Sequence, residues 1–237
     1  MNIIRIIIAF IIAFASLSST PIPIHTTDKI YSHYKLHSHF SKYFTKQNCD
    51  IILDKFYYLN CYSYKHKGTK AVAYHLEAKI LAMGPAGKRP AFKPDMQVPA
   101  PYRTKTQDYT HSGYDRGHTL SNQSMNATIE AQASTFLMSN ITPQNPQINQ
   151  RVWRKAEDRE RAIAKLKGSA EVLNIIIYPK DKEKTEFIKN EIAIPVGYVK
   201  VIESKDIQEC YEYPNHKVDD ESLESYQVDC RGWVSPH

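Results

Sequence analysis

Residues 114–123 read YDRGHTLSNQ, so that an acid, an arginine, a glycine and a histidine follow one another at 115–118. Two further polar segments come later in the chain, SNITPQ at 139–144 and NQRVWRKAEDRER at 149–161. An imidazole has an ordinary pKa near 6.5 and can therefore be neutral and still accept a proton at pH 7. His118 is thus a candidate general base.

The clearest predicted helix spans 144–167, QNPQINQRVWRKAEDRERAIAKLK. Asn145 can cap this helix, and Pro146 suits its first position. Apolar residues recur at helical spacing and predict a side that faces a core. These residues are Val152, Ala156, Ile163 and Leu166.

One stripe of the same helix carries polar groups. Asn149, Trp153 and Glu157 are four residues apart, and each step of four drifts only about 40° around the helix axis. An amide and a carboxylate two turns apart can therefore reach into one cleft. The alternative for Glu157 is a surface ion pair with Arg161, which contributes a few tenths of a kcal/mol.

The remaining pattern predicts an α+β fold, with a mixed or antiparallel sheet core and helices. Residues 84–108 contain five prolines and predict a long loop of the kind that often carries function. Segments rich in β-forming residues are expected to be strands. They are 51–64, 70–82, 134–142, 171–178 and 192–202.

The N-terminus has the layout of a secretory signal peptide, with Arg5, an apolar run to Ala15 and then small residues. An uncleaved anchor is the alternative, although a spanning helix needs about 20 apolar residues and serines interrupt this run. We expect a signal peptide at 1–19, a loosely packed polar arm with several histidines at 20–48, and one domain at 49–237. The expected location is therefore secreted or periplasmic, without stable membrane association after signal cleavage.

Four cysteines fit this compartment, since an even number in an exported chain indicates disulfides. Three pairings are possible, and we predict Cys49–Cys61 and Cys210–Cys230 because these cysteines are close in sequence. A zinc site is the alternative, which the absence of a CxxC pair with nearby histidines disfavours.

The formal net charge is +6 and the pI is near 9.0. Removal of Arg5 with the signal peptide leaves 6 − 1 = +5. This excess is compatible with a polyanionic partner and equally with ordinary solubility.

Taken together, the polar segments resemble the DNA/RNA non-specific endonucleases, the sugar-non-specific nucleases of the ββα-metal (His-Me finger) fold. The resemblance implies a strand that carries His118, a second strand that carries SNITPQ, and then the helix, with 119–133 as a loop or short helix between the strands. It is sharpest over residues 113–161. The matching residues are Asp115-Arg116-Gly117-His118, Ser139 to Gln144, Asn149-Gln150, Trp153, Glu157-Asp158 and Arg161.

The resemblance also implies a metal site. It places the direct protein ligand at Asn149, through the side-chain oxygen, and has Glu157 accept hydrogen bonds from waters around the ion. Mg²⁺ is expected because it prefers oxygen and keeps several waters when few protein ligands are offered. Mn²⁺ or another divalent ion is the alternative.

Further residues belong to the implied site. Asn140 supports the base or the substrate, and Arg89 is the residue that matches a substrate-binding arginine upstream of the histidine. Arg116 is expected to bind phosphate or to pair with its neighbouring aspartate. Arg161 is expected to contact phosphate or to hold Glu157, because a guanidinium fork fits phosphate and carboxylate alike.

The implied function is an exported, Mg²⁺-dependent endonuclease that hydrolyses phosphodiester bonds in DNA and RNA. The attacking water needs a base, which His118 would supply, and the phosphate needs a cation, which Asn149 and Glu157 would hold. Two alternatives stay open: a nucleic-acid-binding protein that does not cleave, and a phosphodiesterase for small substrates.

Overall fold

The computed structural model describes residues 29–234. The predicted signal peptide at 1–19 lies outside these residues. Among the helices that the structure describes, none is long and apolar enough to cross a membrane.

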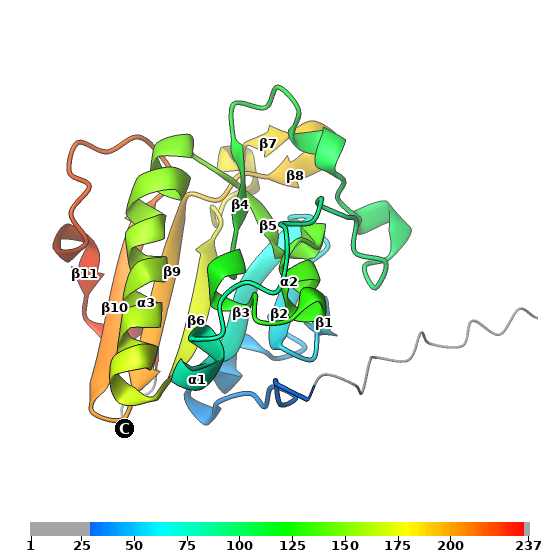
Figure 1. Ribbon diagram of the computed structural model, residues 1–237. Helices are drawn as coiled ribbons and strands as arrows, with labels where there is room; N and C mark the ends of the chain where they lie inside the picture. The colour runs from blue at the N-terminus through cyan, green and yellow to red at the C-terminus, as the bar shows by residue number, and fades with distance from the viewer. Residues whose placement is uncertain (1–28, 235–237) are drawn as a thin grey trace, which may run out of the picture.

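A seven-stranded antiparallel sheet forms the centre of the molecule (Figure 1), in the order β1-β2-β3-β6-β9-β10-β11. The α+β prediction is therefore confirmed. The predicted segments 51–64 and 192–202 are each divided into two strands, and Pro195 lies in the break of the second. The strands of the sheet are β1 Ile51–Asp54, β2 Tyr58–Ser63, β3 Gly68–Glu77, β6 Ser169–Ile177, β9 Gly197–Ser204, β10 Ile207–Pro214 and β11 Gln227–Val228.

Two small two-stranded sheets accompany the large one. β4 (Asp115–His118) pairs with β5 (Ile141–Gln144), and β7 (Phe187–Ile188) pairs with β8 (Ile192–Ala193). The strand predicted at 134–142 is wrong for most of its length. The hydroxyl of Thr128 accepts a hydrogen bond from the amide of Ala131 and caps a helix that takes up the first of these residues.

The helices are mostly short. The longest is α3, which follows a π-helical turn. The helix predicted at 144–167 is confirmed from Pro146 onward. Val152, Ala156 and Ile163 are buried as predicted, whereas Leu166 is 75% exposed and does not face the core. The α-helices are α1 Ala78–Leu81, α2 Ile129–Thr135 and α3 Trp153–Lys167, and the π-helical turn η6 is Ile148–Val152. The 3-10 turns are η1 Ser38–Tyr43, η2 Ala100–Tyr102, η3 Thr106–Tyr109, η4 Asn122–Ser124, η5 Met138–Asn140, η7 Lys182–Lys184, η8 Lys189–Glu191, η9 Glu224–Tyr226 and η10 Cys230–Gly232.

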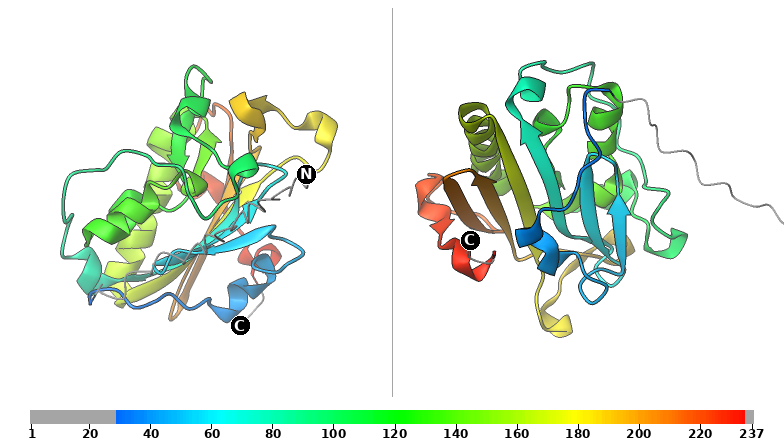
Figure 2. Two further views of the ribbon diagram at one scale, coloured as in Figure 1. Left: turned by 90° about the vertical axis from the view of Figure 1, so that its right-hand side faces the viewer. Right: turned by 90° about the horizontal axis from the view of Figure 1, so that it is seen from below.

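The sheet has α3 on one side and the N-terminal segment on the other (Figure 2). A hydrophobic core lies on each side, because alternate residues of a strand point to opposite faces. Along β9, Tyr198 and Ile202 pack into the core beneath α3. Val199 and Val201 pack into the core on the other face, beneath the N-terminal segment and the C-terminus. The molecule thus has an α3 face and an opposite face.

Residues 29–48 differ from the loosely packed arm predicted for them. Tyr34, Phe40 and Phe44 are buried in the core of the opposite face, and the hydroxyl of Tyr43 donates a hydrogen bond to the carbonyl of Trp233 at 2.6 Å. Aromatic residues alternate with polar ones in this segment. One side of the segment is therefore apolar, although its overall composition is polar.

Both predicted disulfides are confirmed. Cys49–Cys61 ties the N-terminal segment to β2, and Cys210–Cys230 ties β10 to the C-terminal turn. All four cysteines belong to the core of the opposite face, so they strengthen the side of the sheet that lies away from α3.

Candidate active site

β4 and the helix that begins at Pro146 meet on the α3 face of the sheet (Figure 1). The amide of Gln147 donates to the side-chain oxygen of Asn145 at 3.0 Å, which confirms the predicted cap. Asn149 follows one turn later, inside the π-helical turn. Such turns are rare and are frequently found at functional sites.

A cleft of about 420 Å³ lies between these elements. This volume is within the range of ligand pockets. Five of the seven predicted site residues line it: Arg89, Arg116, His118, Asn149 and Glu157. Its other lining residues are Phe92, Asp115, Ser121, Asn122, Gln123 and Arg154.

His118 packs against two aromatic rings, which also contact each other. The ring centres of Phe92 and Phe136 lie 5.3 Å and 4.9 Å from that of the imidazole. Burial among these groups, with a smaller contribution from the positive charge of Arg89, lowers the pKa of His118 to about 3. The imidazole is therefore neutral across the physiological range, and the same burial makes it a weaker base than a histidine in water.

Gly117 brings β4 close to β5. A Cβ at this position would lie 2.3 Å from Oε1 and 2.5 Å from Cβ of Gln144. Glycine is therefore needed for the approach of the two strands, and the backbone next to His118 is fixed by this contact.

Asp115 orients the side chain of Asn149. The amide Nδ2 of Asn149 donates to Oδ2 of Asp115 at 2.9 Å, and Nε2 of Gln150 donates to the same oxygen at 2.8 Å. Because the nitrogen of the Asn149 amide is engaged, its oxygen is the atom left to act as a ligand or acceptor in the cleft.

Glu157 also lines the cleft, two turns after Asn149 on the same stripe of the helix. Burial raises the pKa of its carboxyl to about 7, against the opposing positive charges of Lys200 and Arg161. A cation in the cleft would favour the ionised form. The carboxylates of Asp115 and Glu157 and the amide oxygen of Asn149 form a donor set that suits a hard divalent ion such as Mg²⁺.

Arginines flank the histidine. The guanidinium of Arg89 lies 5.4 Å from the ring centre of Phe136, and that of Arg116 lies 6.0 Å from the ring centre of Phe92. Arg116 also donates to the carbonyl of Thr106 at 3.1 Å. Each guanidinium is thus held by contacts at the cleft wall, and both can attract a phosphate.

Asn140 does not line the cleft but is fully buried behind it. Its Nδ2 donates to the carbonyls of Leu120 and Thr135, both at 2.9 Å, and its Oδ1 accepts from the amide of Leu120 at 2.9 Å. The carbonyl of Asn140 accepts from the amide of Thr119. The side chain thus fixes the chain that leaves His118 and does not project into the cleft.

Arg161 is also mostly buried, beneath the 121–124 loop that forms part of the cleft wall. It donates to the hydroxyl of Ser124 at 3.1 Å, to Oε1 of Gln123 at 3.0 Å and to Oδ1 of Asp158 at 2.5 Å. The guanidinium is therefore placed to hold this loop and to contribute positive charge near Glu157.

Sequence analysis missed a buried ion pair behind the cleft. Lys200 on β9 and Glu160 on α3 are both fully buried and in direct contact. Glu160 also accepts from the hydroxyls of Tyr74 at 2.8 Å and Ser124 at 2.6 Å, and Lys200 donates to Asn174 at 2.8 Å. An isolated lysine in an otherwise apolar strand was the one available signal. Arg154, at the cleft mouth, was missed as well.

Comparison with known families gives a match over most of the chain. A family model for DNA/RNA non-specific endonucleases matches residues 37–233. The match begins inside the segment predicted to be a separate arm and includes the whole cleft.

Individual relatives agree with the family match. The chain is 33% identical over 138 residues to a nuclease of Nostoc sp., covering 57% of this chain and 48% of the relative. It is 28% identical over 153 residues to the mitochondrial endonuclease G of Homo sapiens, covering 61% and 52%. The chain thus spans about half the length of the curated relatives that it matches.

A solved structure has the same architecture. A chain from the crystal structure of the EndoG/EndoGI complex, which concerns the mechanism of EndoG inhibition, superposes with a TM-score of 0.67. The two chains are 27% identical, and the match covers 85% of this chain and 82% of the other.

Proposed function

Since this chain belongs to the DNA/RNA non-specific endonuclease family, we propose that it is an exported, Mg²⁺-dependent endonuclease that hydrolyses phosphodiester bonds in both DNA and RNA. One observation carries the proposal: the neutral imidazole of His118, the oriented amide of Asn149 and the carboxyl of Glu157 line a single cleft with two arginines.

In this proposal His118 is the general base. Its imidazole is neutral at pH 7, and it accepts the proton of the water that attacks the phosphorus. Phe92 and Phe136 hold the ring by packing against it. Asn140 acts as a positioning residue, because its hydrogen bonds fix the backbone immediately after His118.

Asn149 and Glu157 would hold the divalent ion, Asn149 through its side-chain oxygen. When bound, the ion offsets the negative charge of the phosphate and stabilises the departing oxygen. Asp115 engages the amide nitrogen of Asn149 and so leaves its oxygen as the atom available to the ion. The position of the Glu157 carboxyl in the same cleft as Asn149 supports this assignment.

The arginines bind the substrate backbone. Arg89 and Arg116 lie at the cleft wall and would contact phosphate oxygens, whereas Arg161 acts from below by holding the 121–124 loop. Contacts to phosphates carry no sequence information. We therefore expect cleavage with little sequence preference and with strong inhibition by salt.

Export is supported by two features. The N-terminal sequence has the layout of a signal peptide, and both disulfides form within the described domain. Disulfides persist in oxidising compartments. We propose a periplasmic or secreted location on this basis.

The proposal is tested with plasmid DNA, RNA and a small chromogenic phosphodiester side by side, each with Mg²⁺ and with EDTA. Cleavage of both polymers with Mg²⁺ and loss of cleavage with EDTA are expected. His118→Ala is expected to abolish turnover without changing the circular dichroism spectrum. Binding of DNA without cleavage would support a binding protein instead, and cleavage of the small diester alone would support a small-substrate phosphodiesterase.

A further inference from the structure

A second cluster of metal-ligating side chains lies on the opposite face of the sheet. His75 of β3, Glu171 of β6 and Glu203 of β9 are direct neighbours across adjacent strands. They share a face with Leu173 and Val201, which belong to the core of the opposite face. The cluster is therefore separated by the sheet from the cleft of His118.

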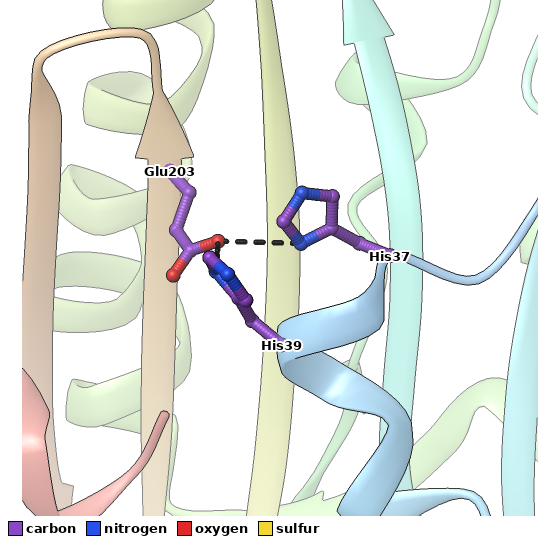
Figure 3. A group of neighbouring side chains, drawn as sticks. All are labelled: His37, His39 and Glu203. Atoms are coloured by element: carbon purple, nitrogen blue, oxygen red, sulfur yellow. Dashed lines mark hydrogen bonds and ion pairs between the residues drawn. The ribbon is translucent and has the colours of Figure 1, made fainter. Parts of the chain in front are cut away.

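Two histidines from the N-terminal segment complete this cluster (Figure 3). Oε2 of Glu203 lies 3.4 Å from Nδ1 of His37 and 3.2 Å from Nδ1 of His39. The two imidazole rings are almost perpendicular, with centres 4.7 Å apart. Ligand atoms of all three residues lie within 4.8 Å of one another.

These distances match the edges of a metal coordination sphere. Zn²⁺ binds imidazole nitrogen and carboxylate oxygen at about 2.0–2.2 Å, which gives about 3.3–3.6 Å between neighbouring ligands of a tetrahedron. Direct hydrogen bonding accounts for only one of the two contacts, that of Nδ1 of His39 with Oε2 of Glu203. Nδ1 of His37 is buried and forms no hydrogen bond within the described part of the chain, although it faces Glu203 at ion-pair distance.

The carboxylate of Glu203 is oriented with one oxygen toward the two histidines. Oε1 of Glu203 accepts from Nε2 of Gln208 at 2.7 Å, which turns Oε2 toward the histidines. Partners of this kind commonly orient metal ligands. The carboxylate is almost fully buried, and Glu171, engaged by His75 at 2.7 Å, adds negative charge to the same pocket, against the single positive charge of Lys205.

We propose that His37, His39 and Glu203 bind a divalent transition-metal ion, with Zn²⁺ as the best-fitting ion and a water in the fourth position. Two imidazoles and one carboxylate suit Zn²⁺ and its first-row neighbours, whereas Mg²⁺ prefers an all-oxygen environment. The site is independent of the nuclease proposal, because it uses none of the residues of the cleft. A bound ion would clamp the segment 29–48 to β9 and so stabilise the folded chain.

The direct test is equilibrium dialysis of the metal-stripped full chain against Zn²⁺, in saturating Mg²⁺ so that the cleft is occupied. One Zn²⁺ per chain is expected for the parent protein, and this stoichiometric binding should be lost in the double variant His37→Ala/His39→Ala. Glu203→Gln should weaken binding at least tenfold. Asn149→Ala should bind Zn²⁺ as the parent does, as should the matched control His33→Ala, which removes an exposed histidine of the same segment that is paired with Asp54.

Thermal unfolding gives a second readout. At a Zn²⁺ concentration one hundredfold above Kd, the Tm of the parent should rise by about 5–10 °C, and that of the double variant should not change. No saturable Zn²⁺ binding by the parent, or equal binding by the double variant, would overturn the proposal.

Chemical modification of the parent protein covers the case in which the variants do not fold. Diethylpyrocarbonate modifies accessible imidazoles, and the modified histidines are then located by peptide mass mapping. Zn²⁺ should protect His37 and His39 but leave His33 reactive. Identical modification of His37 and His39 with and without Zn²⁺ would contradict the assignment of these ligands.

Discussion

Substitution of Lys200 by methionine should be strongly destabilising, because it leaves the Glu160 carboxylate buried without its counter-charge. Both side chains are fully buried and in contact, between β9 and α3. Removing one partner of a buried ion pair costs about 3–5 kcal/mol. Two neutral donors to Glu160, the hydroxyls of Tyr74 and Ser124, remain and do not replace the lost charge.

The assay is urea unfolding at pH 7, followed by circular dichroism. The free energy of unfolding should fall by about 3–5 kcal/mol in Lys200→Met, and the Tm should fall by about 6–20 °C at 2–4 °C for each kcal/mol. The double variant Lys200→Met/Glu160→Gln should be more stable than Lys200→Met alone, since the unpaired charge is gone. Loss of less than 1 kcal/mol in Lys200→Met, or a double variant less stable than that single variant, would refute the reasoning.

Three further predictions concern the site and the framework around it. Gly117→Ala should lower activity and stability, because its Cβ would meet Oε1 of Gln144 at 2.3 Å and Cβ of Gln144 at 2.5 Å. Gln144→Gly in the same chain removes both of these atoms and should restore part of the loss, and absence of any rescue would point to another cause. Burial lowers the pKa of His66 to about 4 from 6.5. As the pH falls, the unfolded chain therefore binds a proton at this residue before the folded chain does. The free energy of unfolding should decrease progressively between pH 6.5 and about pH 4, by up to about 3 kcal/mol. His66→Phe should flatten the stability–pH curve in that window, which urea unfolding at each pH measures; a curve parallel to that of the parent would contradict the assignment. Replacing Cys210 and Cys230 together by serine should cost about 3 kcal/mol for a loop of this length, and an unchanged urea midpoint with an unchanged slope would show that the bridge adds nothing to stability.

The sequence predicted the parts of the fold that depend on local signals. The helix from Pro146 has a cap, a proline at its first position and an apolar periodicity, and all three act within a few residues. The disulfides join cysteines 12 and 20 residues apart. The prediction of a strand at 134–142 was wrong because contacts with residues distant in sequence determine the local structure. The buried side chain of Asn140 holds the carbonyl of Thr135 and the backbone of Leu120, and no pattern within 134–142 shows this.

Most of the candidate site, like most of the fold, was predicted from the sequence. Arg89, Arg116, His118, Asn149 and Glu157 line one cleft, and their positions came from the family resemblance. Contacts between residues distant in sequence were not accessible. Lys200 and Glu160 are 40 residues apart, and their pairing depends on how α3 lies across β9. His39 and Glu203 are 164 residues apart, so the histidines of the N-terminal segment had no visible partner.

The claim that His118 and Asn149 serve one reaction is tested most directly by a double-mutant cycle on plasmid cleavage under single-turnover conditions with saturating Mg²⁺. Rate constants are measured for the parent, His118→Ala, Asn149→Ala and the double variant, with the exposed His216→Ala as the matched control. Residues that act as a unit give non-additive losses. We predict that the double variant cleaves within about tenfold of the slower single variant and that the control matches the parent. Losses that add fully, or a His118→Ala variant as fast as the parent, would contradict the account.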